Sequence, residues 1–319
     1  MRPFFLALIL AAAPALTAQT PLERGRTAFE ARHYAEARAP LLEAARANPR
    51  DAAAPLLLGR LALLSGNAEE AVKWLEQATQ RAPRNAEAQH WMGRAYARQA
   101  RRAGRFTQLR LAGRIRGAFE SAVSLDPDDI GARRDLLEFY LVAPRIAGGG
   151  DDKARAQAAQ LAKRSPMYGR LAEGWIAEAG KNNAAAAKAY EAAIASWPDS
   201  AAPYLALGAL RQRTGDWALA FAAYDRLVAR RPDVNEVNYQ IGRAASLSGM
   251  NLDRGAQALD RYLARMPAEE EPPLASARLR LGAIRERQGN KPEARRQYQL
   301  ALQLDPGLDD AKSGLARVR

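Results

Sequence analysis

The residue types that most often perform catalysis or hold metals are sparse in this chain. Cysteine is absent, and the two histidines, His33 and His90, stand in different segments. No His-Glu-x-x-His or Gly-x-Ser-x-Gly motif occurs, and the run of glycines at 148–150 lacks the Gly-Lys-Ser/Thr of a phosphate loop. We therefore expect no catalytic residues, no metal and no cofactor. An active site assembled from carboxylates of separate segments is the alternative.

Arginine is the side chain whose binding chemistry stands out. The net charge is +13, and arginine outnumbers lysine by 41 to 7. Guanidinium groups bind carboxylates and phosphates through paired hydrogen bonds. Because the basic residues are spread along the whole chain and accompany abundant alanine, as in proteins of GC-rich genomes, the charge alone does not indicate a nucleic acid. We expect no specific nucleic-acid partner.

One stretch is more strongly basic than the rest. Residues 98–116 contain seven arginines and no acidic residue. This pattern has two interpretations, a basic protrusion that binds an anionic polymer or membrane, and a solvated extension of a helix. The residues that would bind the anion are Arg101, Arg102, Arg105 and Arg110.

The elements that must position these side chains follow from a recurrent proline. It occurs at intervals close to 34 residues, from 32 to 44, and a fixed period of this size indicates a solenoid of stacked repeats. The positions are Pro49, Pro83, Pro127, Pro166, Pro198, Pro232, Pro267 and Pro306.

Other residues recur in register with the proline. Twenty-four residues before it an apolar residue precedes Gly, twelve before it stands Ala, and eight before it a large apolar residue; Leu207-Gly208, Ala220 and Tyr224 form one such set. We expect Gly and Ala to let the two helices approach closely. Pairs such as Gly66-Asn67 suit the turn between them. The pattern resembles the tetratricopeptide repeat, over residues 20–306.

The resemblance implies an all-α fold, a right-handed α-solenoid of about eight helix-turn-helix repeats with a C-terminal capping helix. The predicted organisation is a signal peptide at 1–18, eight repeats at 19–307 and the capping helix at 308–319. Insertions fall near 98–114, 143–150 and 268–273. In the second insertion we expect Pro144 to end one helix and Asp151-Asp152 to cap the next, and in the third an acidic linker, Glu269 to Pro273.

In the tetratricopeptide repeat family the first helix of each repeat lines a concave groove that binds protein or peptide partners. The resemblance therefore implies a non-catalytic interaction scaffold for a partner with acidic and apolar residues. Trp175 is either a binding anchor or a packing residue. The Lys and Asn clamp of one subset of the family is absent, since its positions hold Leu22, Arg26 and Leu57. The implied groove residues are Arg60, His90, Arg94, Arg98, Arg134, Trp175, Arg213, Tyr239 and Arg243.

The N-terminus has the features of a secretory signal peptide. Arg2 precedes an apolar run from Phe4 to Ala13, and Ala18 offers a small residue for cleavage. The run is shorter than the roughly 20 residues that span a bilayer, so we expect no transmembrane segment after cleavage. Without cysteine, a lipid anchor at the cleavage site is excluded. The expected location is the periplasm or the extracellular space.

Overall fold

The computed structural model describes residues 19–318, and within that range all regular secondary structure is helical. Sixteen α-helices form eight consecutive pairs, and a seventeenth covers the last pair, so the predicted α-solenoid is confirmed. The pairs are α1 (Pro21–Glu30) and α2 (Tyr34–Ala47), α3 (Ala53–Leu64) and α4 (Ala68–Arg81), α5 (Ala86–Ala100) and α6 (Arg105–Leu125), α7 (Ile130–Val142) and α8 (Asp151–Arg164), α9 (Pro166–Ala179) and α10 (Asn183–Ser196), α11 (Ala201–Arg213) and α12 (Trp217–Arg230), α13 (Glu236–Ser248) and α14 (Leu252–Leu263), and α15 (Leu274–Arg287) and α16 (Lys291–Leu304). The capping helix is α17 (Asp309–Arg317), and the 3-10 helix η1 (Arg145–Ala147) precedes α8.

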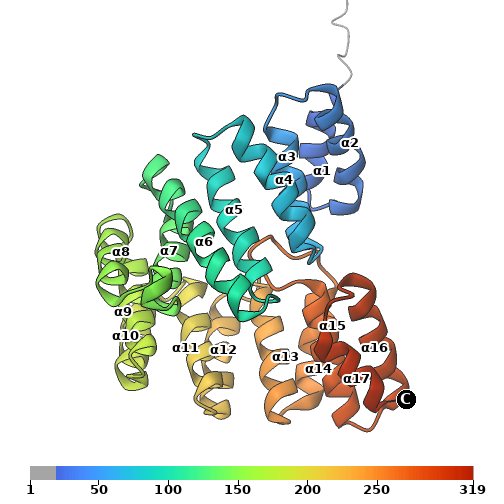
Figure 1. Cartoon of the computed structure of the whole chain (residues 1–319). Helices are drawn as coiled ribbons and strands as arrows, with labels where there is room; N and C mark the ends of the chain where they lie inside the picture. The colour runs from blue at the N-terminus through green and yellow to red at the C-terminus, as the bar shows by residue number, and fades with distance from the viewer. Residues whose placement is uncertain (1–18, 319) are drawn as a thin grey trace, which may run out of the picture.

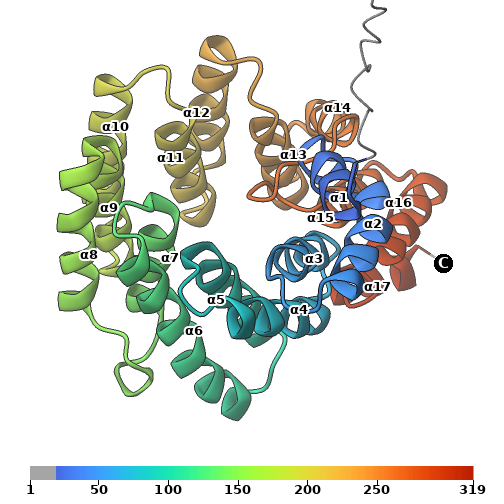
Figure 2. The same cartoon turned by 90° about the horizontal axis from the view of Figure 1, so that it is seen from above.

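The stack of helix pairs curls back on itself. Seen from above, the helices follow a curve that brings α1 to α4 next to α13 to α17 (Figure 2). In the perpendicular view the first repeats lie above the last ones (Figure 1). The two ends of the solenoid therefore face each other, and segments far apart in the sequence can meet. The predicted signal peptide, residues 1–18, lies outside the described residues.

In seven of the eight pairs a glycine of the first helix faces a large apolar residue of the second helix, and the pair of α7 and α8 is the exception. A methyl group on Gly208 would overlap the ring of Tyr224, and one on Gly59 would overlap Leu75. The space that the glycine leaves open is therefore filled by a large side chain, which is itself fully buried. This contact outweighs the roughly 1 kcal/mol that a mid-helix Gly costs against Ala.

The turns between paired helices follow the predicted chemistry in the second repeat. Gly66 adopts φ +72°, a left-handed conformation that ends α3. The Asn67 side chain then accepts a hydrogen bond from the Glu70 backbone N–H at 3.1 Å and caps α4. The same Gly-Asn pair precedes α16, where Asn290 caps the helix in the same way.

The second insertion differs in one detail from the expectation, because Gly150 rather than Asp151 is the N-cap of α8. In the first insertion α6 begins at Arg105. Gly150 has φ +157°, and Asp151 and Asp152 fall in the first helical turn, where their charges favour the helix dipole. Pro144 follows the end of α7 as expected. No helix of residues 19–318 has the length and apolar character that crossing a bilayer requires.

Replacing Ala220 by leucine should destabilise the sixth repeat. Ala220 lies in α12, is fully buried, and belongs to the core that also holds Tyr224. A larger side chain in such a place typically lowers the free energy of unfolding by about 1–3 kcal/mol. The urea midpoint, followed by circular dichroism, should fall clearly below that of Lys188→Ala, a change at an exposed position of α10. Equal midpoints would show that Ala220 is not packed as described.

Candidate functional site

The curl of the solenoid encloses a cavity of about 1150 Å³ between the early and the late repeats. One side is formed by α3, α5 and α7, the first helices of three successive repeats. The other side is formed by residues 266–276, between α14 and α15, and by residues 303–308, where α16 ends. A cavity of this size can hold several residues of a peptide.

Arginines from separate repeats converge on this cavity. Arg60 comes from α3, Arg94 and Arg98 from α5, and Arg134 from α7, and all four line it. Arg60 and Arg94 hold corresponding places, each directly after the recurrent glycine of its helix, Gly59 or Gly93. The stacking of the repeats brings the first helices side by side. Trp91 lies among them, with the guanidinium carbons of Arg60 and Arg94 at 5.1 and 4.8 Å from its ring centroid.

Arg60 is paired with the acidic segment from the far end of the chain. Its Nε donates to Oε1 of Glu269 at 2.8 Å, and its Nη2 contacts the other oxygen of the same carboxylate. Its Nη1 donates to Glu87 at 2.6 Å. The side chains of Arg60 and Glu269 are only 18% and 16% exposed. Burial alone would lower the pKa of Arg60, but the hydrogen bond and charge of Glu269 outweigh burial and raise it.

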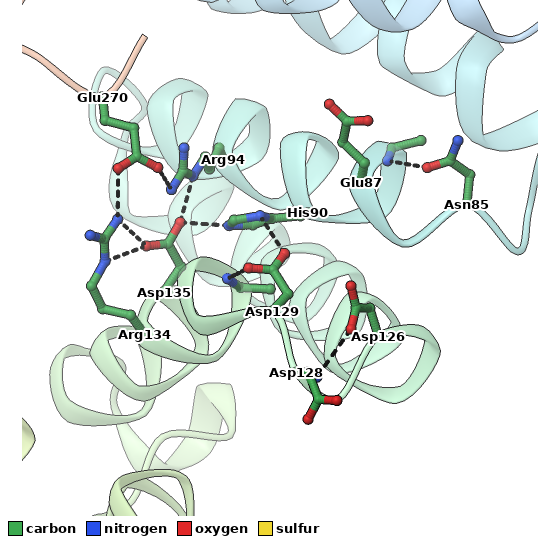
Figure 3. A network of polar contacts seen from close by, with 12 residues as sticks. Asn85, Glu87, His90, Arg94, Asp126, Asp128, Asp129, Arg134, Asp135 and Glu270 are labelled. Carbon is green, nitrogen blue, oxygen red and sulfur yellow. Dashed lines mark hydrogen bonds and ion pairs between the residues drawn. The ribbon is translucent and has the colours of Figure 1, made fainter. Parts of the chain in front are cut away.

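A second network is centred on Asp135 (Figure 3). One carboxylate oxygen of Asp135 accepts from Arg94 Nε at 2.6 Å and lies 2.9 Å from His90 Nε2. The other oxygen lies 3.3 Å from Arg134 Nη2. Burial would raise the pKa of Asp135, yet the His90 contact and the two guanidinium charges together hold it well below its usual range. Asp135 thus fixes the two arginines in place.

The same two arginines also face Glu270. Arg94 Nη2 donates to Oε1 of Glu270 at 3.1 Å, and Arg134 Nη2 lies 3.9 Å from Oε2 (Figure 3). Glu270 belongs to the same acidic segment as Glu269. The sequence predicted this segment only as a linker, because nothing in a local pattern shows what a loop touches across the solenoid.

Arg98 has a different environment. It lines the cavity one helical turn beyond Arg94, and no carboxylate or carbonyl of residues 19–318 pairs with it. Burial and the neighbouring charges of Arg101 and Arg102 lower the pKa of Arg98, with Asp305 acting in the opposite direction. Asp305 itself is paired with Arg102 at 2.5 Å. Arg98 is therefore a cationic group that lines the cavity and is available to an anion.

The remaining predicted residues take other places. His90 is buried and reaches Asp129 and Asp135 rather than the cavity. Arg101 lines the cavity, whereas Arg105 and Arg110 are exposed and do not. Trp175 is half-buried against two core clusters. Tyr239 is buried, and its ring centroid lies 5.5 Å from that of Tyr262. Arg213 pairs with Glu178, and Arg243 donates a hydrogen bond to Gln212. None of these last four lines the cavity.

Sequence reasoning missed two contributors to the site, Trp91 and Asp135. Each lies one position from an expected groove residue, Trp91 beside His90 and Asp135 beside Arg134. A signal for Asp135 existed: a carboxylate next to an arginine on a first helix can hold that arginine and a neighbour from the preceding repeat. The described residues contain no cluster of His, Cys, Asp and Glu arranged for a metal ion.

Paired helices stacked around a concave, arginine-lined surface define a repeat scaffold, a class that binds protein partners. The sequence model of the tetratricopeptide repeat family matches residues 22–86, 171–235 and 247–309. The chain therefore belongs to the tetratricopeptide repeat family. The unmatched stretch between the first two ranges, residues 87–170, covers most of α5 to α8 and holds the first two insertions and most of the cavity arginines.

Three solved structures illustrate the similarity of the course of the chain. The APC/C hetero-tetramer Cut9–Hcn1 aligns with 93% of this chain at 15% identity and a TM-score of 0.48, and this chain spans 55% of the length of that one. A tetratricopeptide repeat protein from Parabacteroides merdae aligns with 81% of this chain and 94% of its own at 16% identity, TM-score 0.47. TTC0263 from Thermus thermophilus aligns with 71% and 96% at 19% identity, TM-score 0.46. No curated protein matches the sequence.

Proposed function

We propose that this protein is a non-catalytic interaction scaffold that holds a segment of a partner protein in the cavity between its early and late repeats. The observation that carries the proposal is the convergence of Arg60, Arg94, Arg98 and Arg134 on one cavity, with Trp91 among them. Guanidinium groups and aromatic rings are enriched among the residues that dominate binding energy at interfaces. The site is thus shifted towards the first four repeats relative to the groove expected from the sequence.

The chemistry of the cavity suits a partner with acidic and apolar residues. Its arginines supply forked donors for carboxylates, while Leu63, Phe139 and Leu308 add apolar surface to the same lining. Trp175, Arg213, Tyr239 and Arg243 are left outside the proposed site, since each is occupied in packing or in a contact with a neighbouring helix.

Removing Arg98 should weaken partner binding without disturbing the fold. Arg98→Ala leaves no carboxylate unpaired, whereas the other cavity arginines hold Glu269, Asp135 or Glu270. A lost hydrogen bond to a charged group is worth about 1.5–3 kcal/mol, roughly tenfold or more in dissociation constant. The measurement is titration calorimetry with a partner obtained by affinity purification from the native host. Lys188→Ala, on the outer helix α10, is the control and should bind like the wild type. If both variants bound the partner with equal affinity, the partner would bind outside this cavity.

We further propose that the protein works outside the cytoplasm, in the periplasm or as a secreted protein, after removal of residues 1–18. The support is the sequence of those residues, with Arg2, the apolar run from Phe4 and the small residue Ala18. The intact mass of the protein from its native host should correspond to a chain that begins at Gln19. A chain recovered from the cytoplasm with Met1 or Arg2 at its start would contradict this.

A further inference from the structure

The segment between α14 and α15, residues 264–273, crosses the inner surface of the early repeats. Arg32 donates to the carbonyl oxygen of Met266 at 3.3 Å, and the Tyr34 hydroxyl donates to that of Pro267 at 3.2 Å. The next side chains along the segment, Glu269 and Glu270, meet the cavity arginines described above. The first four repeats thus each contact the short segment that follows the seventh repeat, one after another along its length.

The segment is held in the manner of a bound peptide. Its backbone carbonyls accept hydrogen bonds from side chains of the solenoid. The Glu269 carboxylate occupies the guanidinium fork of Arg60, and Glu270 accepts one hydrogen bond from Arg94. The Glu271 carboxylate turns back and accepts from the backbone N–H of Ala268 at 2.8 Å, so Glu271 shapes the turn and makes no arginine contact. Pro267, Pro272 and Pro273 limit the freedom of the segment, which reduces the entropy lost on ordering it.

The contacts of the segment become weaker towards its exposed part. The Glu269 side chain is 16% exposed, and both of its carboxylate oxygens are bound by Arg60. The Glu270 side chain is 60% exposed, and its carboxylate lies 3.9 Å from Arg134. Burial raises the pKa of Glu236, at the start of α13, and the charges of Glu271 and Glu270 raise it further, whereas the charge of Arg134 acts in the opposite direction. The cavity also extends beyond the segment to the unpaired Arg98.

We infer that the chain's own acidic segment, residues 267–271, occupies the place of an extended acidic segment of the partner, so that the two compete for Arg60, Arg94 and Arg134. The inference rests on the proposed function, because it names the kind of ligand that the same cavity binds and the segment that regulates this binding. A tethered competitor acts at an effective concentration in the millimolar range. The partner's apparent affinity is therefore reduced by the fraction of molecules in which the segment is closed.

The test neutralises the segment and supplies it in trans. The probe is a fluorescent synthetic peptide with the sequence of residues 264–275, followed by anisotropy at low salt with the purified full-length chain. Glu269→Gln/Glu270→Gln should bind the probe at least about tenfold more tightly than the wild type, the factor expected when one charged hydrogen bond of the competitor is lost. A probe with glutamine in place of its three glutamates should bind neither protein tightly.

Glu69→Gln/Glu173→Gln is the matched control, because it removes the same charge at two exposed sites away from the cavity. It should bind the probe like the wild type. If the neutralised protein is folded by circular dichroism and binds the probe no better than the control, the inference is overturned, while the Arg98→Ala experiment still decides the proposed function. Should the double variant fail to fold, Glu270→Gln alone applies the same test, with an expected gain of about threefold and no gain as the contrary result.

Discussion

Replacing Asp135 by asparagine is expected to lower the free energy of unfolding by about 3 kcal/mol, the lower end of the range for breaking a buried ion pair. Asp135 receives hydrogen bonds from Arg94 and Arg134, faces His90, and has a side chain that is 15% exposed. Without its charge, the two guanidinium groups remain partly buried beside each other with only Glu270 to compensate. Asp128→Asn is the control, since Asp128 pairs with Arg164 while 85% exposed and should contribute less than about 1 kcal/mol.

The pH dependence of stability should change in the same variant. The folded protein holds the pKa of Asp135 below its unfolded value, so this carboxylate stabilises the fold above its ordinary pKa of about 3.9. That stability is lost as the pH falls from there through the lower pKa of the folded state. Asp135→Asn should therefore lose less stability than the wild type on acidification below pH 4, measured by urea titration at several pH values. Parallel acid profiles of the two proteins would show that Asp135 does not carry this linkage.

The number and type of repeats could be predicted from the sequence because each repeat is a local unit. The interval between prolines and the turn pairs Gly66-Asn67 and Gly289-Asn290 depend on residues within one helix pair. The residue that packs against each glycine was harder to predict from the sequence. Gly208 and Gly59 reserve space for Tyr224 and Leu75, and a sequence pattern shows only that all these positions recur together.

The sequence predicted the arginines of the site but not the residues with which they pair. The resemblance to the tetratricopeptide repeat family, in which the first helices line the groove, identified Arg60, Arg94, Arg98 and Arg134. The pairing of Arg60 with Glu269 joins the second repeat to the loop after the seventh, and it depends on how small rotations between repeats accumulate along the solenoid. A local sequence pattern does not reveal this accumulated rotation. The same rotation keeps α11 and α13 away from the cavity, so that Arg213 and Arg243 pair with other residues.

The basic insertion shows how far a local charge pattern leads. Arg101 and Arg102 reach the cavity, and Arg102 pairs with Asp305 near the C-terminus. Arg114 and Arg116 lie 3.6 and 3.8 Å from Glu76 and Glu120. Part of the excess charge of residues 98–116 is therefore balanced by Asp305 and Glu76, which belong to other repeats, and by Glu120 on the same helix. Only the pairing with Glu120 follows from sequence spacing.

Tyr224→Ala is expected to have an effect as large as that of Asp135→Asn, for a different reason. The Tyr224 ring is fully buried, fills the space that Gly208 leaves open, and belongs to the largest core cluster. Truncating a buried aromatic side chain to alanine typically lowers the free energy of unfolding by about 3–5 kcal/mol, since the cavity left behind cannot close. Because repeats are coupled only to their neighbours, the loss should centre on α11 to α14. Urea titration by circular dichroism, with hydrogen exchange to locate the weakened repeats, measures both aspects.

Tyr224→Phe separates the ring from its hydroxyl. The hydroxyl accepts a hydrogen bond from Gln212, whose side-chain oxygen accepts from Arg243. Removing it should cost about 1 kcal/mol, the usual net value of one hydrogen bond, and leave the packing over Gly208 intact. If the phenylalanine and alanine variants lost the same stability, the hydroxyl and not the ring would hold the repeat together. The large residue of each repeat would then not be the complement of its glycine, and the packing rule that relates the sequence period to the fold would fail.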